Sequence, residues 1–216
     1  MASKIVTFVR HGESAHNIER AALHTPDNPL TKYGRKQAKS IQAILGFMDF
    51  DLIVTSPMTR ATETCLLSLE NHNSAKKISP YILPLVCERH SGWKCDNGSS
   101  KSVLQKRFPS LNYDTLMKED EWWYLDEEKF STGPSKNFAK HTEVVSKRIA
   151  KLAEWISGRK EKSIVIYGHG GIFHALLGRM FKNCEVLQVQ WPPRSFPMGS
   201  SHILGNWDTA SKVSKL

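Results

Sequence analysis

The chain has 216 residues, which suits one domain, and its 40% hydrophobic and 24% charged residues are ordinary for a soluble globular protein. A run of about 18 apolar residues, which a transmembrane helix needs, is missing, and the apolar N-terminal segment is too short for a signal-peptide core. The net charge of +9 suits nucleic-acid binding or an enzyme for small anions. Lysine and arginine are spread along the whole chain without a basic cluster, so we expect neither a nucleic-acid nor a membrane partner.

The cysteines are scattered and form neither a Cys-x-x-Cys pair nor a metal-ligand spacing. We therefore expect reduced thiols in an intracellular compartment and no metal site. The four residues are Cys65, Cys87, Cys95 and Cys184.

Apolar, β-branched runs alternate with amphipathic segments along the chain. In chain order we expect a strand at Ile5–Val9, a helix at Thr31–Leu45 capped by Thr31, a strand at Leu52–Thr55, a helix capped by Ser56 with Pro57 in its first position, an extended segment at Ile78–Val86, a helix at Val144–Ile156, a strand at Ser163–Tyr167, a helix at Ile172–Phe181 and a last strand at His202–Leu204. This alternation predicts an α/β three-layer sandwich, in which helices flank a mostly parallel central sheet.

We expect residues 1–216 to form a single domain. Residues 88–137 interrupt the alternation and contain the aromatic cluster Trp122–Tyr124. We interpret this stretch as an insertion over the carboxyl ends of the strands, where such sheets bind ligands. Residues 208–216 are expected to form an exposed tail.

Two of the expected strands end in a histidine beside glycine. Arg10, His11 and Gly12 follow the first strand, and Gly168–Gly171 with His169 follow the strand at Ser163–Tyr167. Glycine lets backbone N–H groups approach a bound anion, and the N-terminus of a helix favours negative charge. A single histidine at a strand end is more often structural, but two on one sheet indicate an anion site.

Two charged residues fit the same site. Arg60 lies in the first turn of the helix expected after Ser56, where a cation opposes the helix dipole at a cost of about 0.3–1 kcal/mol. An anion bound there would make the placement favourable, because a guanidinium can hold two phosphate oxygens. Glu88, after the extended segment, is a candidate proton donor and acceptor. The alternative for both residues is a solvated surface side chain.

Five blocks of this chain resemble the signatures of the histidine phosphatase superfamily, which includes the cofactor-dependent phosphoglycerate mutases. In the order of the family they are Val9–Ser14 with Asn17, Pro29–Ala38, Ser56–Thr64, Glu88 and Gly168–Gly170. Any one block is weak evidence, but five in order are a specific signal.

The resemblance implies a two-step phosphoryl transfer without a metal ion or a cofactor. His11 would attack phosphorus and become phosphohistidine, and Glu88 would protonate the leaving oxygen and later deprotonate water. The groups that hold the phosphoryl oxygens would be Arg10, Arg60 and His169. Further contacts to a small phosphorylated substrate are expected from Asn17, Gly12, Gly170 and Arg89.

The fate of the phosphohistidine distinguishes a phosphatase from a mutase. Cys87–His90 is similar to the mutases, but their arginine pair with a following Tyr-Asp and paired prolines is missing after Glu88. The chain is also short for such a mutase. We therefore expect a metal-independent phosphomonoesterase. The alternatives are a phosphoglycerate mutase, which is an isomerase, and a non-catalytic protein that binds a phosphorylated ligand.

The chain ends in Ser214, Lys215 and Leu216. This tripeptide is a peroxisomal import address when it stands at the free C-terminus. In a eukaryotic cell we expect a peroxisome or related microbody, with the import receptor as a partner. In a bacterium we expect the cytoplasm.

Overall fold

The computed structural model describes residues 3–114, 122–123, 138–192 and 203–208. Its centre is a six-stranded sheet with the order β3-β2-β4-β1-β5-β6. The strands are β1 (Lys4–Arg10), β2 (Leu52–Thr55), β3 (Tyr81–Ile82), β4 (Ser163–Gly168), β5 (Val186–Trp191) and β6 (Ile203–Trp207). The first four are parallel, β5 runs antiparallel to β1, and β6 runs antiparallel to β5. The predicted mostly parallel sheet is confirmed.

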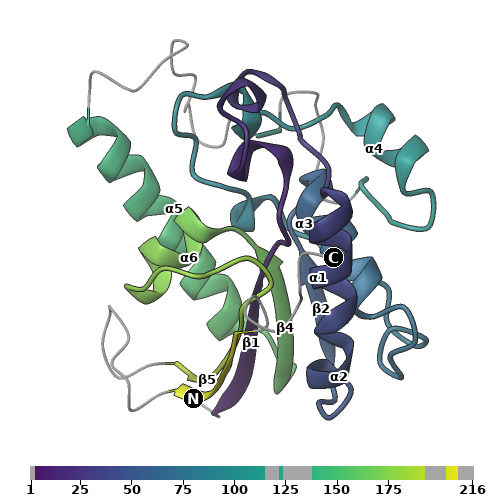
Figure 1. Ribbon diagram of the computed structural model, residues 1–216. Coiled ribbons are helices and arrows are strands. Elements are labelled where there is room, and N and C mark those ends of the chain that lie inside the picture. Colours follow the sequence, from purple (N-terminus) through teal and green to yellow (C-terminus); the bar gives the residue numbers. More distant parts are fainter. Residues whose placement is uncertain (1–2, 115–121, 124–137, 193–202, 209–216) are drawn as a thin grey trace.

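Helices cover both faces of this sheet. The α-helices are α1 (Lys32–Ser40), α2 (Gln42–Leu45), α3 (Thr59–Ser68), α4 (Lys101–Arg107), α5 (Phe138–Gly158) and α6 (Gly170–Leu177), and the short 3-10 helices are η1 (Ala15–Asn17), η2 (Arg20–His24), η3 (Pro84–Val86) and η4 (Lys94–Asp96). In Figure 1, α5 and α6 lie on one side of the strands, and α1 and α3 lie on the other. This arrangement confirms the three-layer sandwich. Within the described residues, no helix is long and apolar enough to span a membrane.

The central strands β1 and β4 are buried on both faces. Val6 and Phe8 of β1 pack into the apolar cluster that contains Leu152 of α5 and Phe173 of α6. Val9 packs into a second cluster, which includes Ala38 of α1. Strands covered on both faces are continuous hydrophobic runs in the sequence, and this is why both were predictable.

The start of α3 differs from the prediction. Its first residue is Thr59, and Ser56 lies before the helix, where its Oγ accepts the N–H of Met58 at 3.2 Å. The carboxylate of Asp27 caps the helix by accepting the N–H of Thr59 at 2.8 Å and its hydroxyl at 2.5 Å. The predicted serine cap was wrong because the capping group comes from a distant part of the chain. The cap predicted at Thr31 is confirmed, since its Oγ1 accepts the N–H of Gly34 at 2.9 Å.

Other elements are shifted or divided relative to the expectations. The helix expected at Thr31–Leu45 is divided at Ile41 into α1 and α2. The helix expected at Ile172–Phe181 begins earlier and ends before Gly178, which has a left-handed φ of 72°. β5 has no counterpart among the predicted strands.

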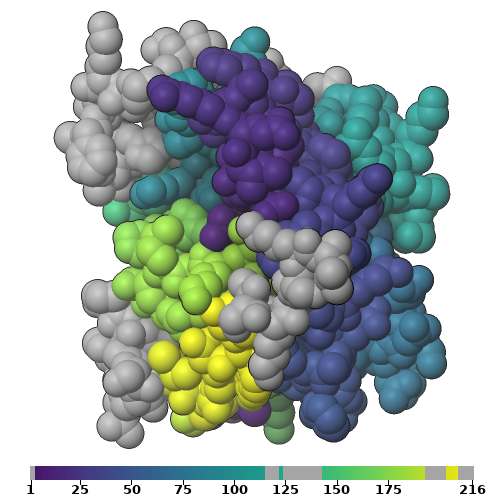
Figure 2. Space-filling view, in the orientation of Figure 1, coloured from purple at the N-terminus to yellow at the C-terminus, as the bar shows by residue number. Residues whose placement is uncertain are grey.

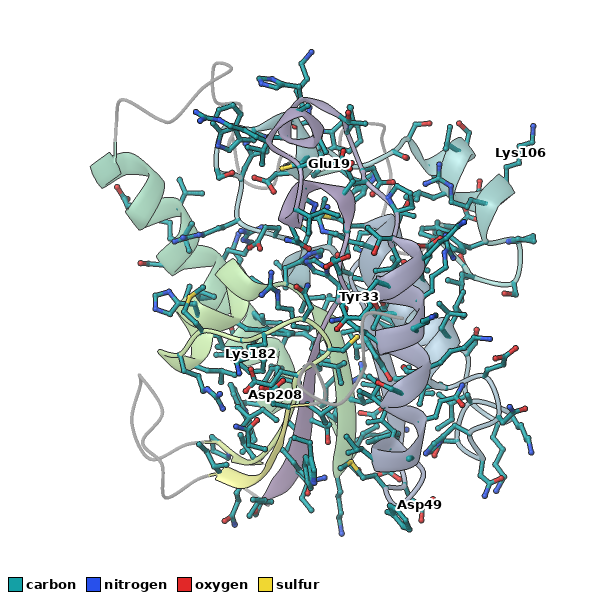
Figure 3. All side chains as sticks on the ribbon, viewed as in Figure 1. Glu19, Tyr33, Asp49, Lys106, Lys182 and Asp208 are labelled. Atoms are coloured by element: carbon teal, nitrogen blue, oxygen red, sulfur yellow. The ribbon has the colours of Figure 1, made fainter. Side chains whose placement is uncertain are left out.

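The insertion and the tail predicted from the sequence are described only in part. In the insertion, α4 and Trp122 join a third apolar cluster that also contains Met58 and Tyr113. Tyr124 lies outside the described residues. The tail beyond Asp208 also lies outside the described residues. The carboxylate of Asp208 itself forms an ion pair with Lys182 at 2.6 Å (Figure 3).

Candidate active site

Two histidines leave the sheet side by side. Arg10 and Gly168 are paired at the ends of β1 and β4, so the residues that follow them, His11 and His169, emerge at the same edge. Their ring centroids are 5.1 Å apart, and their exposed fractions are 1% and 0%. In Figure 2 the purple segment that follows β1 lies against the light green α6, which begins after His169.

One ring nitrogen of His11 is engaged in a hydrogen bond to the backbone. Its Nδ1 lies 2.7 Å from the carbonyl oxygen of Gly12, which can only accept, so Nδ1 carries the proton. The lone pair is therefore on Nε2. Burial, together with the positive charge of Arg60 and the neighbouring His169, lowers the pKa of His11 well below its ordinary value of 6.5. The imidazole is neutral at pH 7 and can act as a nucleophile.

His169 is the N-cap residue of α6. Its Nε2 lies 2.9 Å from the Oγ of Ser56, and its Nδ1 is buried without a hydrogen-bond partner among the described residues. If Ser56 donates to Nε2, the proton of His169 is on Nδ1 and is available to an anion. Burial, and then the charge of Arg60, lower the pKa of His169 well below 6.5.

Two arginines complete the cationic surroundings of His11. Arg60 is 0% exposed and donates from Nη1 to the carbonyl of Cys95 at 3.0 Å, while its Nη2 lies 3.8 Å from a carboxylate oxygen of Asp96. Arg10 donates to the carbonyl of Phe181 at 2.6 Å. Each arginine keeps at least one buried N–H group without a partner in the described chain. Buried donors of this kind favour a bound anion.

Glu88 lies at the N-terminus of α6. Its carboxylate accepts the N–H groups of Gly171 and Ile172, both at 3.0 Å, and that of Arg89 at 2.9 Å. A Cβ on Gly171 would lie 2.3 Å from a carboxylate oxygen of Glu88 and 2.9 Å from Nε of Arg89, so both side chains lie over this glycine. Negative charge at a helix N-terminus is stabilising.

Three other residues were expected to contact the substrate: Asn17 is exposed, whereas Gly12 and Gly170 are closely packed. Asn17 is exposed and accepts the N–H of Ser14 at 3.0 Å. The N–H of Gly12 donates to Oγ1 of Thr64 at 3.0 Å, and a Cβ on Gly12 would lie 2.6 Å from the carbonyl oxygen of Gly34. A Cβ on Gly170 would lie 3.2 Å from Nε of Arg10. Close packing therefore explains why glycine stands at both positions. Contact of Gly12 and Gly170 with the substrate stays a prediction.

Comparison with known proteins assigns the family. A sequence profile of the histidine phosphatase superfamily (branch 1) matches residues 6–194. The chain belongs to this superfamily. A probable phosphatase of Schizosaccharomyces pombe is 32% identical over 154 residues, which are 70% of each chain. A 2,3-bisphosphoglycerate-dependent phosphoglycerate mutase of Methanosarcina acetivorans is 34% identical over 101 residues, or 47% of this chain and 40% of the mutase.

The fold agrees with this assignment. The crystal structure of the α-ribazole phosphatase of Shigella flexneri superimposes with a TM-score of 0.55 at 23% identity and covers 86% of this chain and 89% of that chain. The family match and the similarity to the Schizosaccharomyces pombe protein assign this histidine phosphatase to the phosphatase class of enzymes. Within the described residues, no group of three or more histidine, cysteine or acidic side chains is placed to hold a metal ion.

Three further residues contact or adjoin the side chains of this site and are not among the predicted site residues. Ser56 stood within a recognised block but was interpreted as a helix cap. His16 lies with its ring centroid 5.8 Å from that of His11, and burial, with the charge of Arg60, lowers its pKa to about 3. Arg148, on α5, is 1% exposed. The available signal for Arg148 was its place on the apolar face of an amphipathic helix, between Val145 and Leu152.

Proposed function

We propose that this histidine phosphatase is a metal-independent phosphomonoesterase that works through a phosphohistidine on His11. The observation that carries the proposal is the state of His11, a buried neutral imidazole whose Nδ1–H is bound to Gly12. The ring of His169 lies 5.1 Å from that of His11, and the charges of Arg60 and Arg10 act on His11. Each of these three neighbours has a buried side-chain nitrogen without a partner among the described residues. Cationic donors around a neutral nucleophile match what phosphoryl transfer requires.

In the first step, Nε2 of His11 forms a bond to phosphorus while the bond to the ester oxygen breaks. Arg10, Arg60 and Nδ1–H of His169 hold the phosphoryl oxygens and stabilise the charge that develops on them. Glu88 in its protonated form gives a proton to the leaving oxygen, and the substrate departs as an alcohol.

In the second step, water attacks the phosphorus of the phosphohistidine. Glu88, now a carboxylate, takes a proton from this water, the P–N bond breaks, and its electron pair returns to Nε2 of His11. The products are inorganic phosphate and the original enzyme. In a mutase the bound acid would accept the phosphoryl group instead of water.

The test is a rapid quench in alkali after mixing with a radiolabelled phosphomonoester. We expect label on the wild-type protein at His11 and none on His11→Asn, whose hydrolysis rate falls to background. His174→Asn, which changes an exposed histidine of α6, is the control. Equal hydrolysis by wild type and His11→Asn, or loss of activity with a chelator, would contradict the proposal.

A second measurement separates the phosphatase from the mutase. Incubation with 3-phosphoglycerate and a trace of the bisphosphate should release phosphate without forming 2-phosphoglycerate. Formation of 2-phosphoglycerate at a rate similar to phosphate release would favour the mutase. A protein that only binds phosphorylated ligands would form neither product.

We also propose that Ser214-Lys215-Leu216 acts as a peroxisomal import address in a eukaryotic cell. Support comes from the sequence of the tripeptide alone. A fluorescent protein carrying residues 208–216 at its C-terminus should enter peroxisomes, and the same fusion without the last three residues should stay in the cytosol. Equal distribution of the two fusions would contradict this proposal.

A further inference from the structure

Among the described residues, Arg148 is a buried cation without a matching anion. Its exposed fraction is 1%, and its Nε and Nη2 have no hydrogen-bond partner among the described residues. Only Nη1 is engaged, with the Sγ of Cys87 at 3.2 Å and the backbone carbonyl of Glu88 at 3.4 Å. None of the ion pairs in the described part of the chain includes Arg148. Burial of an unpaired charge costs several kcal/mol, so a purely structural role leaves this guanidinium unexplained.

The unpartnered atoms of the molecule point to a function for it. Most of the buried side-chain nitrogen and oxygen atoms that lack a partner in the described residues belong to only four residues. They are Arg10, Arg60, His169 and Arg148. The first three are the proposed phosphoryl-binding groups, and Arg60 and His169 are as deeply buried as Arg148. Burial therefore does not separate Arg148 from the residues that a substrate must reach.

Arg148 lies next to the segment that carries Glu88. Its guanidinium contacts the backbone of Glu88, the residue proposed to protonate the leaving oxygen. Among the described residues the carboxylate of Glu88 forms no ion pair with Arg148, and its oxygens instead accept the backbone N–H groups of Arg89, Gly171 and Ile172. After burial and the charges of nearer groups, the charge of Arg148 also contributes to the lowered pKa of His169, so its field reaches that imidazole.

We propose that Arg148 binds a second anionic group of the substrate, on the leaving-group side of Glu88. This inference rests on the proposed phosphomonoesterase function and names its substrate class: phosphomonoesters whose alcohol part carries a carboxylate or a second phosphoryl group. A guanidinium suits both, because its fork of N–H groups can donate two parallel hydrogen bonds to either anion.

The test compares substrates that differ only in the second anion. One pair is 3-phosphoglycerate and glycerol 3-phosphate, and the other is a hexose bisphosphate and the corresponding hexose monophosphate. Arg148→Met removes the charge and keeps an unbranched side chain, and Arg148→Lys keeps the charge but loses the fork. Lys147→Met removes an exposed charge from the same helix as the matched control. Thermal unfolding of each variant, and the alkali-stable label on His11, are measured alongside.

For the wild type we expect the substrate with the second anionic group to have the higher kcat/KM in at least one pair. With Arg148→Met, kcat/KM for that substrate should fall about 10- to 100-fold, mainly through KM, as loss of a charge-assisted hydrogen bond predicts. The counterpart without the second anion should change less than about 3-fold, Arg148→Lys should fall in between, and Lys147→Met should match the wild type. The pair in which Arg148→Met has its effect identifies whether the second anion is a carboxylate or a phosphoryl group.

Two outcomes would overturn the assignment while the phosphohistidine label persists. One is an equal loss for substrates with and without the second anion, which would make Arg148 a support for Glu88 or for the fold. The other is unchanged kinetics. Absence of label and of hydrolysis with every substrate would instead contradict the proposed function itself.

Discussion

The Nε2 of His169 lies 2.9 Å from the Oγ of Ser56, and this bond joins the N-terminus of α6 to the loop that follows β2. Ser56 is itself fixed, because its Oγ accepts the N–H of Met58. The serine therefore fixes the orientation of the imidazole, whose Nδ1 on the other side has no partner among the described residues. The two residues come from strands that are neighbours in the sheet, β2 and β4.

We predict that Ser56→Ala lowers kcat/KM about 3- to 10-fold for p-nitrophenyl phosphate. Loss of one neutral hydrogen bond is worth about 0.5–1.5 kcal/mol, and the His169 ring becomes free to adopt the other tautomer. Ser68→Ala is the matched control, because Ser68 is also buried and pairs with the hydroxyl of Tyr167 at 2.8 Å, away from the site. It should lower stability and leave kcat/KM unchanged. An equal loss of activity in both variants would contradict a positioning role for Ser56.

The proposed double role of Glu88 predicts a dependence on the leaving group. Glu88→Gln should reduce hydrolysis of alkyl phosphates by about 10²- to 10⁴-fold, the usual contribution of general acid–base catalysis. With p-nitrophenyl phosphate the first step needs no proton, so p-nitrophenol should appear in a burst of one equivalent per enzyme. The second step should then be slow, because no base activates the water. Stopped-flow absorbance measures both phases, and a linear trace without a burst would contradict the assignment.

The buried histidines make stability sensitive to acid. Burial, with nearby arginine charge, lowers the pKa of His11 and of His169 well below 6.5, whereas in the unfolded chain both titrate near 6.5. Below that pH the unfolded state binds more protons than the folded state, so the free energy of unfolding falls as the pH falls. The loss begins near pH 6.5 and continues toward the lowered pKa values. Each group contributes at most about 1.4 kcal/mol per pH unit.

Urea denaturation between pH 7.5 and pH 5 measures this effect. We predict a steady fall in the free energy of unfolding for the wild type, with a smaller slope for His169→Gln. His174→Gln is the control, since His174 is an exposed histidine on the same helix. A slope that His169→Gln leaves unchanged would show that other groups cause the acid sensitivity.

The site residues that could be predicted from the sequence are those that follow the ends of strands. Parallel strands covered on both faces are apolar along their whole length, so β1 and β4, with His11 and His169 after them, were visible in the sequence. The sequence did not predict β5, because Gln188 and Gln190 interrupt its apolar residues. The remaining alternation of apolar and polar residues is too short to indicate a strand. β5 does extend the sheet, pairing with β1 in antiparallel register.

The unpredicted part depends on contacts between distant segments. Asp27 caps α3 across more than thirty positions of sequence, which no local pattern reveals. Arg148 occupies an apolar helix face, where a single charged residue usually reflects a solvated edge of the helix. Only the fold shows that this face packs against the segment that carries Glu88.

The last prediction concerns the contact between α1 and the segment after His11. A Cβ on Gly34 would lie 2.0 Å from the carbonyl oxygen of Glu13, a backbone atom that cannot move without shifting the loop. Gly34→Ala should therefore cost about 1–3 kcal/mol in the free energy of unfolding, despite the better helix propensity of alanine. It should also lower kcat/KM several-fold, because Glu13 is two residues from the proposed nucleophile.

Gly158→Ala is the matched control for this substitution. Gly158 is the last residue of α5, and a Cβ there would meet no atom within 4 Å. The same exchange should leave kcat/KM unchanged and alter the free energy of unfolding by less than about 1 kcal/mol, with any gain due to helix propensity. Urea denaturation and steady-state kinetics measure both variants. Gly34→Ala with wild-type stability would mean that the backbone of Glu13 yields freely, and the predicted coupling between α1 and His11 would then be wrong.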